Sequence, residues 1–361
     1  MISVAIIGAG IGAQHLAGYR ALPARFKVAA LCDLDLERAA QATGNAPDIR
    51  LTDDLASVLA DDTIELIDIC LPPHLHFPTI MQALEAGKHV VCEKPVTRAL
   101  AELDKVEAAA KASGKQVFPV FQYRYGPALD QLAALQKAGL CGKAYTASIE
   151  THWNRDSAYY SVPWRGTWAG EAGGALLGHA IHAHDILCHV LGPVAEVFAF
   201  TDTRVNPIET EDCAAVAFRM QSGALVTSSV TLGAGNDTTR LRFCFEGLTA
   251  QSGSAPYTPA EAAWRFIARN PAMQPQIDAV VAAVPAGPVG FTGYLDAIAT
   301  ALSGRGDSHV SLGAGRRSIE LVSAIYSAAR NNAPVQLPLG KGAEFYETWL
   351  PSQEMQTKTG P

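Results

Sequence analysis

Residues 3–12 read SVAIIGAGIG, an apolar strand followed at once by a glycine-rich turn that opens a helix. Gly8 permits the tight turn, Gly10 lets the backbone approach a pyrophosphate, and Gly12 allows the helix to pack closely on the strand. The N-terminus of such a helix also favours a bound negative charge. This stretch therefore predicts a dinucleotide-binding strand–turn–helix unit at the start of the chain.

The second apolar strand supports this interpretation. Residues 26–32 read FKVAALC and end at Asp33, 21 residues after Gly12. A carboxylate at this position accepts hydrogen bonds from an adenosine ribose and repels a 2′-phosphate. We therefore expect NAD, with NADP less favoured. Arg38 is close in sequence but is expected to lie one turn into the next helix.

The rest of the first 122 residues repeats this alternation. Apolar runs at 64–71, 89–93 and 116–122 are separated by the helical stretches TIMQALEAG and ELDKVEAAAKASG. Near-continuous apolar strands separated by helices indicate a parallel sheet that is covered on both faces. The fold class is therefore α/β, with a doubly wound Rossmann domain over residues 1–122.

The pattern changes after residue 122. A short helix begins at Pro127, and residues 143–153 then alternate in polarity as a strand does. Further strands are expected at 194–201, 212–220, 224–232 and 239–246, with one helix at about 173–190. Consecutive strands without intervening helices indicate a mainly antiparallel sheet. We expect residues 123–361 to form a second α/β domain with a large, mostly antiparallel open sheet for substrate binding and oligomerisation.

Composition restricts the possible classes of protein. The 361 residues suggest two domains, and 48% hydrophobic against 17% charged residues excludes disorder. The net charge of −7, without clustered Lys or Arg, argues against nucleic acid and anionic membranes as partners. No apolar run reaches the roughly 18 residues of a membrane span, and no Lys or Arg precedes Arg20. Seven scattered cysteines indicate reduced thiols, so we expect a cytoplasmic protein.

A longer motif points to a family. The segment LPPHLHFPTIMQALEAGKHVVCEKP ends in Glu93-Lys94-Pro95. With the glycine-rich turn and Asp33, it resembles the Gfo/Idh/MocA family of nicotinamide-dependent oxidoreductases, and the likeness continues at 173–193, 211–218 and 324–338. The resemblance implies hydride transfer between NAD and a secondary alcohol or ketone of a sugar, inositol or sugar derivative. It also implies a homodimer or homotetramer.

The family's catalytic lysine corresponds to Lys94, and the resemblance also implies a cis Lys94–Pro95 bond. An ammonium group beside a reacting oxygen stabilises the negative charge that develops there. A lysine that precedes a proline has an extended backbone, which would hold its side chain in one direction. A solvated surface lysine is the alternative.

The family's catalytic histidine corresponds to His182. Its usual pattern, Asp-x-x-x-His-x-x-Asp, is matched at His182 and Asp185, but Gly178 replaces the first aspartate. His179 lies three residues before His182 and is expected to share its helix face. We expect His179 to bind substrate hydroxyls in place of the missing carboxylate.

The same helix invites a metal interpretation, because His179 and His182 could share an ion with Glu171. The family normally needs no metal, and histidine spacing without a complete ligand set does not make a site. We expect no metal, and we expect His184 and His189 to be structural.

An aromatic and basic segment precedes this helix. Flat rings cover the apolar side of a sugar, while Arg and Asn side chains bond its hydroxyls or a carboxylate; core packing of the tryptophans is an equally weighted alternative. The segment contains Trp153, Asn154, Arg155, Tyr159, Trp164, Arg165 and Trp168.

Two sets of site residues follow from these arguments. The predicted cofactor-binding residues are Gly8, Gly10, Ile11, Gly12, Asp33, Leu71, Pro72, His76, Glu93, Lys94 and Gln122. The predicted substrate-binding residues are Lys94, Tyr123, Arg124, Trp153, Arg155, Trp164, Arg165, His179 and His182. Two other functions stay open: a glycosidase that uses NAD for transient oxidation of the sugar, and a non-catalytic sensor of sugar or NAD.

Overall fold

The computed structural model describes residues 1–306 and 309–351. The chain forms two compact units. The first contains Met1–Phe121 and Phe291–Arg316, and the second contains Gln122–Gly290 and the described residues from Arg317 onward. Each unit is described by itself.

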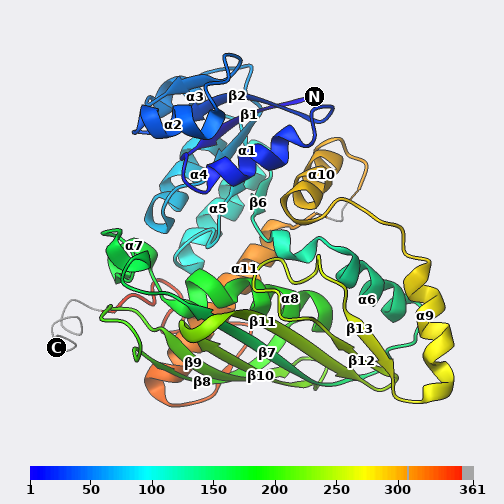
Figure 1. The fold of residues 1–361 in the computed structure, drawn as a ribbon. Coiled ribbons are helices and arrows are strands. Elements are labelled where there is room, and N and C mark those ends of the chain that lie inside the picture. Colours follow the sequence, from blue (N-terminus) through cyan, green and yellow to red (C-terminus); the bar gives the residue numbers. More distant parts are fainter. Residues whose placement is uncertain (307–308, 352–361) are drawn as a thin grey trace. The chain divides into compact units, whose positions relative to one another are not determined.

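The first unit is built on a six-stranded, fully parallel sheet with the strand order β3-β2-β1-β4-β5-β6 (Figure 1). The order reverses between β1 and β4, which is the switch point where doubly wound sheets bind their ligands. The strands are β1 (Ile2–Ile7), β2 (Phe26–Cys32), β3 (Arg50–Thr52), β4 (Leu66–Ile69), β5 (His89–Cys92) and β6 (Val117–Pro119). This arrangement confirms the predicted Rossmann sheet.

Local sequence explains the helices between these strands. Asp35 and Asp54 accept backbone N–H bonds at the starts of α2 and α3, while Gly44 and Gly114 end α2 and α5 in the left-handed conformation. The helices are α1 (Gly12–Arg20), α2 (Leu36–Thr43), α3 (Leu55–Leu59), α4 (His76–Glu85) and α5 (Leu100–Ser113). Polar caps therefore set the starts of α2 and α3, and glycines set the ends of α2 and α5.

The unit boundaries differ from the predicted domains in one respect. The first boundary lies within one residue of the predicted one, but residues 291–316 return to the first unit. They include most of α10 (Gly290–Leu302), whose Tyr294 hydroxyl donates to the carbonyl oxygen of Phe118 at 3.0 Å. Arg25 and Asp296 form an ion pair of 3.0 Å. Periodicity shows that a helix has an apolar face but not which sheet that face covers.

The second unit contains an eight-stranded sheet in the order β13-β12-β11-β7-β10-β9-β8-β14. Only the β7–β10 pair is parallel among these neighbours, which confirms a mostly antiparallel sheet. Its strands are β7 (Ala144–Asn154), β8 (Val194–Asp202), β9 (Cys213–Met220), β10 (Leu225–Thr231), β11 (Gly233–Phe245), β12 (Leu248–Gln251), β13 (Arg265–Ala268) and β14 (Val335–Gln336). Its helices are α6 (Pro127–Lys137), α7 (Trp168–Glu171), α8 (Ile181–Leu191) and α9 (Gln274–Ala282), and α11 (Leu312–Asn331) begins in the first unit and continues into the second.

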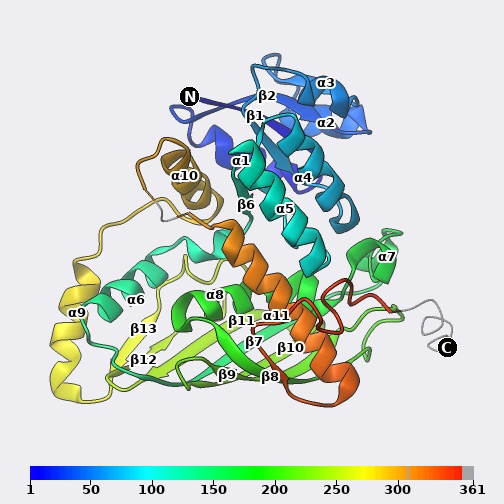
Figure 2. The ribbon, with the colours of Figure 1, turned by 180° about the vertical axis from the view of Figure 1, so that it is seen from behind.

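The two faces of this sheet differ. Helix α8 contacts β7 on one face (Figure 2), and side chains along β9 and β10 alternate between buried and exposed. Within the described part of the chain, no helix lies over the other face, where Phe200, Leu225 and Ile267 are exposed. The expected dimer or tetramer stays a prediction.

Membrane insertion through a helix finds no support in the fold. No helix within residues 1–306 or 309–351 is both long enough and apolar enough to span a bilayer.

Candidate active site

The glycine-rich turn connects β1 to α1 at the switch point. Gly8 has φ +103°, and a Cβ there would lie 2.5 Å from the carbonyl oxygen of Cys70, so only glycine fits. A Cβ on Gly12 would lie 2.8 Å from the side chain of Ile6, which shows how closely α1 packs on β1. A Cβ on Gly10 meets nothing within 4 Å. The backbone at Gly10 is therefore open to a ligand, which fits the pyrophosphate of a dinucleotide at the N-terminus of α1.

Asp33 lies at the end of β2, as predicted for the ribose-binding carboxylate. It accepts hydrogen bonds from the backbone N–H groups of Ala9 at 2.6 Å and Asp35 at 2.8 Å. Arg38 reaches back from the first turn of α2 and donates to the same carboxylate at 2.6 Å. Burial alone would raise the pKa of Asp33, but the bonds from Arg38, Ala9 and Asp35 hold that pKa below its ordinary value. Asp33 is therefore a charged, oriented acceptor with a guanidinium beside it.

We expect Asp33→Ala to weaken NADH binding and to strengthen NADPH binding. The substitution removes the ribose acceptor and releases Arg38, whose side chain is 54% exposed, to pair with a 2′-phosphate. A charge-assisted hydrogen bond contributes about 1.5–3 kcal/mol, so the ratio of the two affinities should change by about tenfold or more. Titration of protein fluorescence with both nucleotides measures it. Asp33→Ala combined with Arg38→Ala should lose the gain for NADPH, and tighter NADPH binding by the unaltered protein would contradict the assignment.

The other predicted cofactor residues follow neighbouring strands. Leu71 and Pro72 follow β4, and Glu93 and Lys94 follow β5, so both pairs lie at the carboxyl edge of the parallel sheet. The Lys94–Pro95 bond is cis, which confirms that expectation. Gln122 belongs to the second unit.

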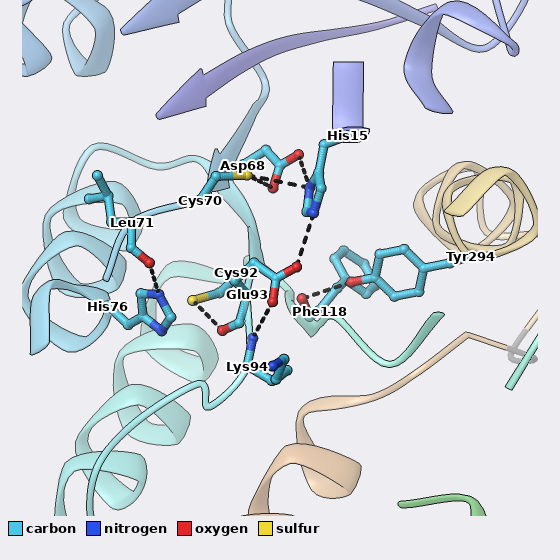
Figure 3. Close-up of polar contacts among 10 residues, drawn as sticks. All are labelled: His15, Asp68, Cys70, Leu71, His76, Cys92, Glu93, Lys94, Phe118 and Tyr294. Atoms are coloured by element: carbon cyan, nitrogen blue, oxygen red, sulfur yellow. Dashed lines mark hydrogen bonds and ion pairs between the residues drawn. The ribbon is translucent and has the colours of Figure 1, made fainter. Parts of the chain in front are cut away.

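His76 is buried between the segments that follow β4 and β5. Its Nδ1 lies 2.7 Å from the carbonyl oxygen of Pro95, and its Nε2 lies 2.7 Å from that of Leu71, as Figure 3 shows for Leu71. Burial lowers the pKa of His76, although the hydrogen bonds to the two carbonyl oxygens act to raise it. The structure therefore makes His76 a bridge between these segments, and its predicted contact with cofactor stays a prediction.

In the second unit, His182 lies in the first turn of α8 and is buried. Its ring stacks on Tyr123, with 4.2 Å between ring centroids and 18° between planes. The next residue, Arg124, donates two hydrogen bonds to Asp185, at 2.6 and 2.5 Å. The segment 122–124 thus contacts α8 at two successive positions and orients the His182 ring. Arg124 was predicted to bind substrate, and the structure gives it Asp185 as a partner.

The helix expected at 173–190 is not one continuous α-helix, which corrects that expectation. Residues Leu176–Ala180 form a π-helical segment, and α8 begins at Ile181. A π turn holds more residues than an α turn, so the relative direction of His179 and His182 differs from that in a regular α-helix, and the shared helix face stays a prediction. His179 instead contacts the Trp153 ring, at 5.2 Å between centroids, and the Tyr159 hydroxyl at 3.4 Å from its Nε2.

Glu211, which carries no role in the sequence interpretation, holds the start of this π-helical segment. Its buried carboxylate accepts hydrogen bonds from the N–H groups of Gly174 and Leu176, at about 3 Å, and from the Tyr326 hydroxyl at 2.9 Å. Burial raises the pKa of Glu211 to about 7, although these bonds oppose the shift. A Cβ on Gly174 would lie 1.8 Å from the Glu211 carbonyl oxygen, so glycine is required for this close approach.

Arg155 and Arg165 bring together three of the predicted aromatic residues around Tyr159, whereas Trp168 packs on Tyr326 at 5.7 Å between ring centroids. Arg155 lies over the rings of Trp153 and Tyr159, at 5.0 and 5.1 Å, and Arg165 lies over Tyr159 at 4.0 Å and Trp164 at 4.8 Å. Trp153 is 5% exposed. We call this set, together with His179, the aromatic–arginine cluster. Trp153 packs as a core residue does, Trp164 is partly exposed, and the arginines lie over the rings.

Both arginines of the cluster have acidic partners, and the sequence interpretation missed Asp237 and its neighbour Tyr257 as site residues. Arg155 pairs with Asp237 at 3.0 Å and donates to the Tyr257 hydroxyl at 3.1 Å. Arg165 lies 3.8 Å from Glu171. The two positive charges are therefore balanced by two carboxylates. Asp237 and Tyr257 lie more than 80 residues from Arg155 in sequence, so no local pattern points to them.

The remaining histidines of α8 have structural surroundings. His184 is buried with its Nε2 2.9 Å from the Ser228 hydroxyl, and burial lowers the pKa of His184 and of His189 to about 4. Within residues 1–306 and 309–351, the group that could gather around a metal ion is His15, Asp68 and Cys70 in the first unit. The α8 histidines and Glu171 do not form such a group in this part of the chain.

Comparison with known families matches both units. The sequence model of an oxidoreductase family with an NAD-binding Rossmann fold, Gfo/Idh/MocA, matches residues 2–121. The model of a Gfo/Idh/MocA C-terminal domain matches residues 129–250.

Individual proteins agree with these matches. An uncharacterised oxidoreductase of Bacillus subtilis, YrbE, is 28% identical over 74% of this chain and 79% of its own length. A levoglucosan dehydrogenase of Pseudarthrobacter phenanthrenivorans is 29% identical over 56% of this chain and 54% of its own. The WlbA dehydrogenase of Bordetella pertussis, solved with NADH and UDP-GlcNAcA, is 26% identical and superposes with a TM-score of 0.81 over 94% of this chain and 99% of its own. The chain belongs to the Gfo/Idh/MocA family of NAD-binding oxidoreductases.

Proposed function

We propose that this protein is an NAD-dependent dehydrogenase that acts on a secondary alcohol of a sugar, inositol or sugar derivative, or on the matching ketone. The observation that carries the proposal is the aromatic–arginine cluster, whose His179 contacts the rings of Trp153 and Tyr159 and lies in the π-helical segment directly before α8, the helix of the stacked His182. Rings with interleaved donors suit the apolar faces and hydroxyls of a sugar. Relatives named as levoglucosan, glucoside and inositol dehydrogenases support the same substrate class.

The proposed roles follow from the chemistry of each side chain. Bound NAD supplies the hydride acceptor. His182 accepts the hydroxyl proton, because a neutral imidazole is a suitable base near neutral pH. Lys94 donates a hydrogen bond to the reacting oxygen and stabilises the negative charge that develops on it. His179 binds a neighbouring hydroxyl, and Tyr123 holds the His182 ring through stacking.

Incubation with NAD and a panel of sugars, glycosides and inositols tests the proposal. NADH absorbance and released products are followed together. A dehydrogenase produces NADH in proportion to oxidised sugar. Release of an aglycone without net NADH would indicate the glycosidase alternative, and ligand binding without turnover of any panel member would indicate the sensor.

The charge balance of the cluster leads to a prediction about the substrate. We expect the unaltered protein to prefer a neutral sugar over the matching uronate, because Asp237 and Glu171 already neutralise Arg155 and Arg165. Asp237→Asn keeps the shape of the side chain and releases Arg155. The ratio of kcat/KM for uronate over neutral sugar should then rise by about tenfold, as one charge-assisted hydrogen bond allows.

The control for this prediction is Asp202→Asn. Asp202 pairs with Arg204 in an exposed contact at 3.1 Å, so its removal releases an arginine outside the cluster. That variant should leave the ratio unchanged. A preference of the unaltered protein for the uronate would show that the cluster favours a negatively charged substrate, which would contradict this prediction.

A further inference from the structure

The strongest unexplained feature of the first unit is a buried histidine between two carboxylates. His15 lies in α1, with no exposed surface. Its Nδ1 is 2.8 Å from Asp68 Oδ2 in β4, and its Nε2 is 3.1 Å from Glu93 Oε1 after β5 (Figure 3). The close packing of α1 at Gly12 allows the ring to reach both strands.

The number of available protons restricts the protonation states that His15, Asp68 and Glu93 can have. An ionised carboxylate can only accept hydrogen bonds, and a neutral imidazole carries one N–H donor for its two nitrogens. Both nitrogens of His15 face carboxylate oxygens, so both contacts are hydrogen bonds only when both nitrogens carry a proton, or when a carboxyl group does. Without a proton between them, the lone pairs of a carboxylate oxygen and an imidazole nitrogen face each other in a buried site and repel, which favours a proton at each contact.

The series of hydrogen bonds continues from Glu93 to Lys94. The second oxygen of Glu93, Oε2, accepts the backbone N–H of Lys94 at 3.0 Å. The Glu93 carboxylate is therefore fixed at one oxygen by His15 and fixes Lys94 with the other. We propose that His15 is an imidazolium held between Asp68 and Glu93, and that the hydrogen bonds of these three buried residues position Lys94 for its reaction. The proposal rests on the proposed function, in which Lys94 is the catalytic lysine.

The groups around His15 agree with a positive imidazole. Burial by itself would lower the pKa of His15, but the Asp68 carboxylate raises it well above its ordinary value. Cys70 Sγ lies 3.4 Å from Nδ1, and burial raises the pKa of Cys70 to about 12, so it is a neutral thiol. Tyr19 is buried with a raised pKa and stays neutral. The His15 ring lies 4.5 Å from the Phe291 ring between centroids, with the planes tilted by 51°.

The same side chains could be considered metal ligands, because His15, Asp68 and Cys70 converge. A metal at Nδ1 would need the lone pair of that nitrogen, whereas a protonated Nδ1 donates to Asp68 instead. The two states are therefore mutually exclusive, and one experiment separates them.

The first test is the protonation state of His15 in the whole protein, read from the ring ¹⁵N signals of histidine-labelled samples between about pH 6 and 9. We expect both nitrogens of His15 to show the imidazolium signature throughout. His89 lies half-buried in the same unit, its pKa is lowered by burial, and its Nδ1 accepts the backbone N–H of Gln116 at 3.1 Å, so it serves as the neutral reference at the upper end of this range. A neutral His15 ring over this range, or a stoichiometric metal in the purified protein, would overturn the proposal.

The second test uses a matched pair of substitutions. The amide nitrogen of His15→Gln can take the place of Nε2 and keep the donor to Glu93, whereas that of His15→Asn takes the place of Nδ1 and keeps only the donor to Asp68. We expect His15→Asn to lower kcat roughly 10- to 100-fold, as loss of positioning does. His15→Gln should stay within severalfold of the unaltered enzyme, and NADH affinity should change little in either. His89→Asn is the control that should leave kcat unchanged.

These results separate the two proposals. If Lys94→Met keeps its activity, the proposed role of Lys94 fails, whatever His15 does. If Lys94→Met is inactive while His15→Asn and His15→Gln lose kcat equally, or neither loses it, the positioning role of His15 fails. If both variants are too unstable to assay, the ¹⁵N signals of the unaltered protein still decide the protonation state on which the proposal depends.

Discussion

Lys94→Ala is expected to lower kcat by roughly 10²–10³-fold on a proven substrate, while NADH affinity stays within severalfold. The physical reason is that a group which stabilises charge on the reacting oxygen acts mainly in the transition state, and removing one such group commonly costs about 2.7–4 kcal/mol. The backbone of Lys94 is held by Glu93, so the loss should be confined to the side chain. Steady-state kinetics and fluorescence titration with NADH measure the two quantities.

Lys88→Ala is the matched control for this prediction. Lys88 precedes β5 and Lys94 follows it, so the two lysines lie at opposite ends of the same strand. The Lys88 ammonium donates to the carbonyl oxygen of Asp61 at 2.8 Å, and its loss should affect stability rather than kcat. Retention of most activity in Lys94→Ala would place the catalytic centre elsewhere.

His182→Ala is expected to lower kcat strongly and to remove the acid limb of the pH–rate profile, whereas His179→Ala should mainly raise KM and keep that limb. A base must be unprotonated to accept a proton, so activity falls as pH drops through its titration. His182 is oriented by the stacked ring of Tyr123, while His179 belongs to the aromatic–arginine cluster through Trp153 and Tyr159. Profiles of kcat and kcat/KM for both variants test this division.

A deuterated substrate must first show that chemistry limits the rate, because cofactor release would mask the effect. A further variant tests whether His179 replaces the family's aspartate. A Cβ on Gly178 meets nothing within 4 Å, so the position can carry a side chain, and Gly178→Asp in the His179→Ala background should lower KM again. The opposite behaviour of the two histidine variants would make His179 the base.

The features that the sequence predicts correctly are those with a local physical cause. The apolar runs of β1, β2, β4 and β5 are near-continuous because both faces of a parallel sheet are buried, and the structure has these strands. Gly8 is glycine because of its positive φ and the nearby carbonyl of Cys70, and Asp33 lies directly after β2 as predicted, while its contact with a ribose stays a prediction. The cis Lys94–Pro95 bond, which the structure confirms, was expected from the family resemblance and not from a local pattern.

Features that depend on packing between distant segments became clear only in the structure. Two such features are the return of Phe291–Arg316 to the first unit and the π-helical segment before α8. Both depend on which surfaces pack together, and the periodicity of apolar residues does not specify this. Arg38 lies five residues from Asp33, but its contact depends on a side-chain direction that sequence spacing does not specify.

The hydrogen bonds that join Asp68, His15 and Glu93 are the clearest case of a feature that only the structure shows. Its contacts join residues 53 and 78 positions apart, and the sequence interpretation gave His15 no role. A local pattern specifies strands, turns and helix ends because these depend on neighbouring backbone and side-chain preferences. The proton state of a buried imidazole depends instead on which distant carboxylates the fold brings to its two nitrogens, and only the tertiary structure decides that.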